Sequence, residues 1–213
     1  MQDTQSLPDT ISIFPLEGAV LLPGGKLPLR IFEPRYLEMT DDALATSRLI
    51  GMIQPVTSEG PNPALYAVGC VGRLTSWNET SENRYGIVLT GVCRFRVREE
   101  VSAPRLYRMM RVDYTEFMGD MDTSAPEPAI DRTRLAAGIR QFFGRHHQEN
   151  LWSTIEDFPT GLLVNSLAMI CPFAPSEKQA LLEAPTTADR ARLLVTLIEM
   201  NAATPTGSEG TMQ

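Results

Sequence analysis

The chain has 213 residues, 43% of them hydrophobic, and a formal net charge of -7. This length and composition exclude a disordered protein and predict a globular one with one large core or two smaller ones. The negative charge disfavours nucleic acid as the main partner, since such proteins gain affinity by neutralising phosphates. The polar start, Met1 to Gln5, and the lack of a long apolar run predict neither a signal peptide nor a membrane span.

Three cysteines, Cys70, Cys93 and Cys171, lie far apart in apolar sequence. This setting is typical of small buried side chains in a reducing compartment. It predicts neither a disulfide framework nor a zinc site, and it favours a cytoplasmic location.

The first half of the chain is predicted to be mostly β-strand. Alternating apolar residues between Gly-, Pro- and Asn-rich turns predict strands at 11–14, 27–32, 49–56, 65–76, 85–98 and 107–117. One helix is expected at 34–44, because Pro34 suits a first helical turn and Tyr36, Leu37 and Leu44 share one side. These elements indicate a partly closed, mostly antiparallel β subdomain over residues 1–118.

The second half changes to a helical period. The stretch MGDMDTSAPEP at 118–128 is acidic and has no apolar period. Residues 119–128 are therefore predicted to be a linker. Apolar residues at helical spacing follow at 130–143, 163–170 and 193–198, with Pro172 ending one helix, a further helix starting near Ser176 and Thr187 expected to cap the last one. An α-helical subdomain is therefore expected at 129–203, followed by a flexible tail at 204–213.

Pro23-Gly24-Gly25-Lys26 invites comparison with a phosphate-binding loop. That loop needs Gly, four residues, Gly-Lys, and then Ser or Thr. Here Val20 stands where the first Gly belongs and Leu27 where the hydroxyl belongs, so the stretch is interpreted as a turn between two apolar segments.

No catalytic, cofactor or metal site is predicted elsewhere. The two histidines, His146 and His147, are adjacent and point apart on a helix, and no further ligands stand at a helical step beside them. A Ser-Lys dyad could use only Lys26 or Lys178, and Lys178 is expected to be solvated in the polar SEKQ stretch. The chain is therefore expected not to be an enzyme.

Arg94, Arg96 and Arg98 fall on one face of the clearest strand by the period of two. They could bind an acidic partner or a nucleic-acid backbone. Alternatively, they form the solvated face of a half-buried strand and are balanced by nearby acids. The second interpretation is favoured, because arginine is abundant throughout the chain.

Four methionines, Met109, Met110, Met118 and Met121, concentrate around the expected boundary between the subdomains. Flexible thioethers suit a surface that accepts varied apolar segments, and they equally fill irregular gaps in a core. Gap-filling is the favoured interpretation.

Three stretches, taken in order, resemble the N-terminal domain family of Lon proteases, in particular its stand-alone bacterial members. They are IFPLEGAVLLPGGKLPLRIFEPRYL at 13–37, the pair VGCVGRL and GIVLTGVCRFRV at 68–74 and 86–97, and KQALLE at 178–183. The resemblance covers about residues 10–200, and several motifs at ordered spacing are more specific than a single short one.

The resemblance implies an α+β fold in which a PUA-like β pseudo-barrel precedes an α-helical bundle, which agrees with the order of periods along the chain. In Lon this region precedes an ATPase and a peptidase and helps to recognise substrates. No Walker motif is found in these 213 residues. The implied function is therefore a non-enzymatic module that binds unfolded or specific polypeptides, or an ATP-dependent protease.

Arg30, Glu33, Arg35 and Tyr36 are the candidate residues in the opening stretch. One hypothesis places Arg30, Arg35 and Tyr36 on a groove that binds an extended peptide. The other pairs Glu33 with Arg30 or Arg35 to anchor the helix on the barrel, as buried polar groups are usually satisfied structurally. The alternative function is an RNA-binding PUA-like module that uses the Arg94, Arg96 and Arg98 stripe.

Overall fold

The structure, a computed structural model, describes residues 7–57, 60, 62–80, 84–122, 130–145 and 157–203. The chain divides into two compact units. The first comprises Met1–Ala125 together with Asn165–Glu183, and the second comprises Pro126–Val164 together with Ala184–Gln213. His146, His147 and the predicted tail lie outside the described residues.

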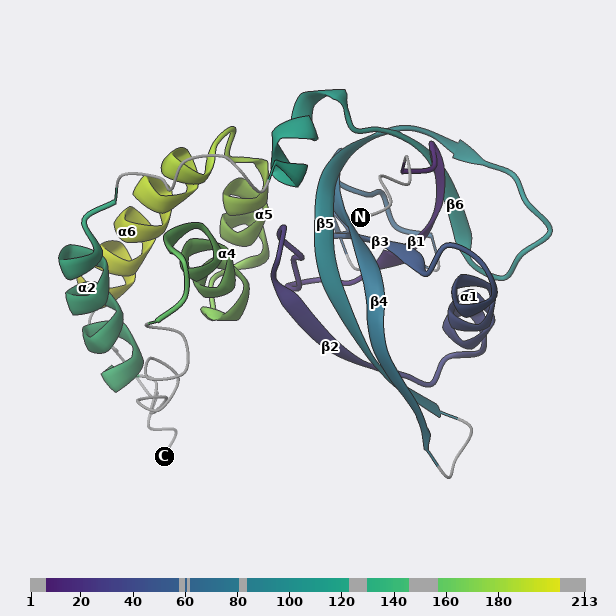
Figure 1. Cartoon of the computed structure of the whole chain (residues 1–213), viewed down its shortest axis with the longest axis horizontal. Coiled ribbons are helices and arrows are strands. Elements are labelled where there is room, and N and C mark those ends of the chain that lie inside the picture. The colour runs from purple at the N-terminus through teal and green to yellow at the C-terminus, as the bar shows by residue number, and fades with distance from the viewer. Residues whose placement is uncertain are drawn as a thin grey trace, which may run out of the picture. The chain divides into compact units, whose positions relative to one another are not determined.

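The first unit contains a six-stranded sheet (Figure 1). Its strands are β1 (Thr10–Pro15), β2 (Lys26–Ile31), β3 (Leu49–Ile53), β4 (Val68–Thr80), β5 (Arg84–Val101) and β6 (Arg108–Asp113), in the order β2-β5-β4-β3-β1-β6. A further pairing between β5 and β6 closes the order into a ring, with β2 attached outside it. All the pairings are antiparallel except that of β1 with β3. A closed ring is what a β pseudo-barrel requires.

The long strand β5 makes this closure possible. Its residues 84–96 pair with β4 on one edge, while the other edge carries β2 at 85–90 and β6 at 96–101. Two glycines allow the close approaches inside the ring. A Cβ on Gly91 would overlap the carbonyl of Leu22, and one on Gly69 would overlap the ring of Phe95. The core between the strands includes Ile13, Ile50 and Phe95, all buried.

Helix α1 (Pro34–Ala45) follows β2 and starts with Pro34 in its first turn. Its buried face consists of Tyr36, Met39, Thr40 and Ala43, spaced three or four residues apart. The hydroxyl of Thr40 donates to the carbonyl of Tyr36 at 2.8 Å, so this buried polar side chain is satisfied within the helix.

The first unit also takes helix α5 (Pro175–Glu183) and the second part of α4 (Thr160–Ile170). Polar contacts attach α5 to the sheet. Nζ of Lys178 donates to the carbonyls of Gly18 and Met169 at 2.9 and 3.0 Å, and Nε2 of Gln179 donates to the carbonyl of Val68 at 3.1 Å. The side chain of Gln54 joins this network through Gln179 at 3.1 Å. Lys178 was expected to be solvated, but the structure buries it at 9% exposure.

The 3-10 helix η1 (Thr115–Met121) follows β6 and covers part of β5, with Phe117 buried against the strand. The expected linker was 119–128, but residues 119–121 form the end of this helix. Residues 123–128 of the expected linker lie outside the described residues. The methionines divide between the two interpretations, since Met110 is buried and Met118 and Met121 are exposed.

The second unit contains α2 (Arg132–Arg145), the start of α4 and α6 (Thr187–Ala203). Its core includes Leu135 and Ile139 of α2 with Leu194 and Ile198 of α6. Thr186, rather than the expected Thr187, caps α6. Its hydroxyl accepts from the N–H of Asp189 at 3.1 Å, while the Asp189 carboxylate accepts from the N–H of Thr186 at 3.2 Å.

The predicted α+β class and the order of strands before helices are therefore confirmed. The expected subdomains placed every helix after residue 129 in one helical body. Residues 165–183 instead belong to the same compact unit as the sheet. Lys178 and Gln179 of α5 form hydrogen bonds to backbone carbonyls of that unit.

Candidate functional site

A pocket of about 250 Å³ lies in the first unit, beside the start of α1. Both apolar and polar side chains line it. Its lining residues are Ile13, Pro15, Leu16, Glu17, Arg35, Tyr36, Pro55, Gly60, Asn62, Pro63, Leu106, Tyr107 and Arg108. A cavity of about 150 Å³ holds benzene, so this volume suits a single apolar or aromatic side chain.

Four parts of the chain build the pocket. The end of β1 contributes Pro15 and the first turn of α1 contributes Tyr36. The connection from β5 to β6 contributes Leu106 and Tyr107, and the connection from β3 to β4 contributes residues from the range 55–63. The ring of Tyr36 packs on that of Phe14, with centroids 4.2 Å apart, and is only 7% exposed. Tyr36 is therefore a fixed wall of the pocket. Leu106, by contrast, is 66% exposed, which is unusual for a large apolar side chain that lines a pocket.

The charged side chains around the pocket have partners. The guanidinium of Arg108 donates to both carboxylate oxygens of Glu100, at 2.9 and 2.7 Å, and to the carbonyl of Pro63 at 2.9 Å. This contact lowers the pKa of Glu100. Arg35 pairs with Glu33 at 2.8 Å. Neutralised charges at the edge leave the apolar wall as the main source of binding energy.

The tyrosines of the pocket wall are held in their neutral form. Burial raises the pKa of Tyr36. Burial, followed by the hydrogen bond that its hydroxyl donates to Asp42 at 2.7 Å, raises the pKa of Tyr107 to about 12. A neutral phenol on a rigid ring offers apolar contact area with little loss of conformational entropy.

The side chains that could supply metal-binding or nucleophilic chemistry are dispersed or buried. Within the described ranges, no group of three or more His, Cys, Asp or Glu side chains could hold a metal ion. The thiols of Cys70, Cys93 and Cys171 are buried, and burial raises the pKa of each, to about 12 for Cys93 and Cys171. Burial lowers the pKa of Lys178, but two carbonyls hold its ammonium.

The structure separates the residues predicted for the opening stretch. Arg35 and Tyr36 line the pocket, and Glu33 orients Arg35 from the position before α1. The predicted pairing of Glu33 with an arginine is thus present. Arg30 lies elsewhere, exposed on β2.

The arginines of the β5 stripe are paired one by one. Arg94 is 3% exposed, and its guanidinium forms two bonds to Asp120, both at 2.8 Å, while stacking over Phe117. The more exposed Arg96 pairs with Glu116 at 2.6 Å, and Arg98 pairs with Asp113. The hydrogen bonds from Thr115 and Arg98 lower the pKa of Asp113. Each arginine is thus balanced by an acid, as the second interpretation expects, but Arg94 is buried and not solvated.

Sequence reasoning missed Leu106, Tyr107 and Asp120. Leu106 lies in a short connection with no periodic pattern, Tyr107 was assigned to the predicted strand 107–117, and Asp120 lies in the stretch predicted to be a linker. The exposed apolar Leu106 beside Tyr107 was the one available signal, since connecting segments often carry binding residues.

The fold is that of Lon N-terminal domains. One similar solved structure is a Lon N-terminal domain protein from Xanthomonas campestris, with a TM-score of 0.63 and 22% identity over 88% of this chain and 97% of that one. Another is the N-terminal domain of the Mycobacterium avium complex Lon protease, with a TM-score of 0.62 and 15% identity over 89% and 98%. Identities this low establish the fold alone.

The sequence establishes the family. Residues 10–200 match the model of the ATP-dependent protease La (LON) substrate-binding domain, and the chain belongs to that family. Lon protease 2 of Myxococcus xanthus is 34% identical over 53% of this chain, and Lon protease 2 of Sorangium cellulosum is 28% identical over 89% of it. The chain spans only 14% and 24% of the length of these two proteins. None of the described helices is long and apolar enough to cross a membrane.

Proposed function

We propose that this protein is a non-enzymatic module that binds polypeptide segments, with one apolar side chain of the client in the pocket beside α1. Membership of a substrate-binding family supports recognition as the role. The observation that carries the proposal is the small pocket walled by Tyr36 and Tyr107, with the exposed Leu106 at its edge. Unfolded chains expose the apolar side chains that such a pocket accepts.

The size of the pocket limits the kind of ligand. Pockets for small molecules and cofactors usually measure about 300–1,000 Å³. A pocket of about 250 Å³ lies below that range. A single anchoring side chain, supported by contacts along the surface outside the pocket, accounts for this geometry.

Replacing Leu106 by Ser tests the proposal. The measurement is the affinity for a permanently unfolded probe, reduced and carboxymethylated lactalbumin. Losing one exposed apolar contact of leucine size should weaken binding about tenfold. The unfolding midpoint should stay unchanged, because Leu106 is largely in solvent.

Met118→Ser is the matched control. Met118 is another exposed apolar residue of the first unit and is not part of the pocket. Its replacement should leave the affinity unchanged. Equal affinity in the Leu106 variant and the wild type would contradict the proposed pocket, and equal losses in both variants would indicate a diffuse apolar surface.

A protease partner is part of the same proposal, because the relatives in this family are Lon proteases. A pull-down from native lysate, divided into RNase-treated and untreated halves, tests it. Reproducible capture of an ATP-dependent protease or of particular proteins that survives RNase is expected. Recovery of partner proteins only from the untreated half would instead favour the RNA-binding alternative. That alternative also requires an affinity for RNA that falls steeply as the salt concentration rises.

A further inference from the structure

Strand β2 has one edge that no strand among the described residues covers. It stands last in the strand order and pairs only with β5, from Lys26 opposite Thr90 to Ile31 opposite Tyr85, without a register shift. Every strand of the closed ring has at least two strand neighbours. A regular strand with a free edge is a template on which an extended peptide can add as a further strand.

The register shows which backbone groups face outward. The N–H of Gly91 donates to the carbonyl of Gly25 at 2.9 Å. Every second residue from Gly25 therefore directs its backbone N–H and C=O toward β5, and the residues between them direct theirs outward. Pro28, opposite Val88, is one of the outward residues, so its lack of an N–H costs no hydrogen bond to β5. The outward groups are therefore the N–H and C=O of Lys26 and of Arg30, and the C=O of Pro28.

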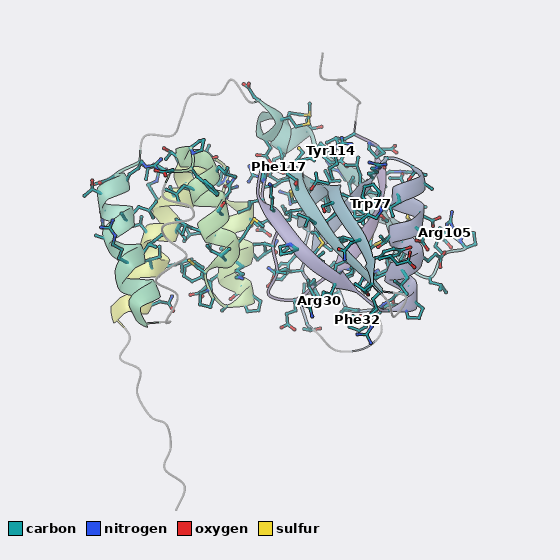
Figure 2. All side chains as sticks on the ribbon, turned by 60° about the horizontal axis from the view of Figure 1, so that its bottom comes forward. Arg30, Phe32, Trp77, Arg105, Tyr114 and Phe117 are labelled. Atoms are coloured by element: carbon teal, nitrogen blue, oxygen red, sulfur yellow. The ribbon has the colours of Figure 1, made fainter. Side chains whose placement is uncertain are left out.

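The side chains of β2 divide into two faces. Lys26, Pro28 and Arg30 are exposed on the outer face, whereas Leu27 and Leu29 are half-buried on the inner face. Figure 2 shows Arg30 and Phe32 near the same end of this strand, and Phe32 is 63% exposed. A guest strand would thus meet two cations on one face and leucines on the other.

The two cations have no acidic partner among the described residues. No ion pair or hydrogen bond of either side chain is found there, in contrast to the paired arginines of β5 and β6. The residues opposite them on β5 are Thr90 and Gly86, which are uncharged. In a chain of net charge -7, two exposed, unpaired cations four residues apart on an edge strand give that edge a positive character.

A second copy of the chain does not suit this edge. Antiparallel pairing of two β2 strands centred on Pro28 would set Lys26 of each copy opposite Arg30 of the other. Like charges directly opposite each other are destabilising. Lysine and proline on an edge are also a known means of preventing such self-association. The same charges favour a guest that carries acids.

We propose that β2 binds an extended peptide by strand addition. The central five residues of this guest peptide have acids at the first and fifth positions and apolar residues at the second and fourth. The acidic side chains lie opposite Lys26 and Arg30, and the apolar ones cover Leu27 and Leu29. The pattern is acid–apolar–any–apolar–acid. The inference rests on the proposed function in that both ligands are polypeptides, but it uses a different surface.

Peptide binding tests the proposal directly. The probes are fluorescent peptides that contain Glu-Leu-Thr-Val-Glu or its charge-reversed form Lys-Leu-Thr-Val-Lys, measured by anisotropy with the full chain. The acidic peptide should bind at least about tenfold more tightly, since the reversed one places like charges opposite each other. The double variant Lys26→Glu with Arg30→Glu should reverse this preference. Equal binding of both peptides to the wild type would overturn the proposal.

Backbone pairing is tested separately from charge. Methylating the central Thr amide of the acidic peptide removes the N–H that would donate to the carbonyl of Pro28, and it should abolish binding. Methylating the adjacent Leu amide, which points away from β2, should not. On binding, the amides of Lys26 and Arg30 should become protected from hydrogen exchange, while those of Leu27 and Leu29 should stay as they were. Protection elsewhere alone would contradict strand addition.

The two proposals fail in different ways. Leu106→Ser should weaken binding of the unfolded probe and leave binding of the acidic peptide unchanged. The β2 double variant should no longer bind the acidic peptide. If the acidic peptide never binds while the unfolded probe depends on Leu106, strand addition is wrong and the pocket stands. If neither probe binds, both proposals are wrong.

Discussion

At the scale of single residues, neighbouring side chains of one pattern have different roles. Arg94, Arg96 and Arg98 alternate along β5, yet Arg94 is buried and the other two are partly exposed. The register of β5 with β6 shifts between Val97 and Glu99, so a strict period of two does not hold through Arg98. The difference in exposure arises because Phe117 and Asp120 of η1 cover Arg94, whereas Arg96 meets only Glu116 at the more exposed start of that helix. No periodic pattern in the sequence indicates that residues 119–121 continue that helix.

The buried pair of Arg94 and Asp120 should therefore contribute far more to the free energy of unfolding than the exposed pair of Arg96 and Glu116. Asp120→Ala leaves a buried guanidinium without its carboxylate, and about 3–5 kcal/mol of unfolding free energy should be lost. Glu116→Ala removes the partner of the more exposed Arg96 and should cost about 0–1 kcal/mol. Urea unfolding of both variants measures the difference, and similar losses would contradict the assigned burial.

Lys178 shows the limit of local sequence reasoning. The SEKQ stretch is polar, so a solvated lysine was expected, and only the packing of α5 places its ammonium on two backbone carbonyls. One of these carbonyls belongs to Gly18, 160 positions away in the chain. Contacts of such long range are invisible to any pattern read along a short window.

At the scale of elements, the sequence predicts existence and order well. Every strand and helix with a clear period was predicted near its observed position, including β2 after the Pro23-Gly24-Gly25 turn. What could not be predicted is which strands pair, because closure of the ring depends on the length of β5 and on the glycines where chains approach closely. The pocket was found only in part for the same reason, since β1, α1 and the β5–β6 connection meet there through the tertiary fold.

Gly91 should be among the least replaceable residues of the sheet. An alanine Cβ there would overlap the carbonyl oxygen of Leu22, which is backbone and cannot rotate away. Gly91→Ala should therefore destabilise the protein by about 1–3 kcal/mol or more. Gly119→Ala, where a Cβ meets nothing within 4 Å, is the control and should change stability by no more than about 0.5 kcal/mol. Thermal unfolding of the two variants compares them.

At the scale of the whole molecule, the first compact unit is discontinuous in sequence. The chain leaves it after Ala125 and returns at Asn165 with the end of α4 and with α5. A helical period alone assigns 165–183 to a helical body. The hydrogen bonds of Lys178, Gln179 and Arg94, the last to the carbonyl of Leu182 at 3.1 Å, instead join this segment to the β unit.

A fragment of residues 1–125 should accordingly be less stable than the same region in the full chain. It loses the partners of buried Arg94 and Gln54, and each unmade buried hydrogen bond costs about 1–3 kcal/mol. Trp77 fluorescence during urea unfolding reports this, with Trp152→Phe in the full chain so that one indole is compared with one. A synthetic peptide of residues 165–183 should raise the midpoint of the fragment, and an unchanged midpoint without it would show that the sheet is self-sufficient.

The burial of Lys178 also makes the chain easy to label chemically. The sequence contains two lysines, and of these only Lys26 is exposed in the folded protein. An amine-reactive dye at neutral pH should therefore acylate Lys26 and the N-terminal amine while sparing Lys178 until the protein unfolds. Since Lys26 stands on the edge of β2 that no described strand covers, a dye there would report whatever approaches that strand.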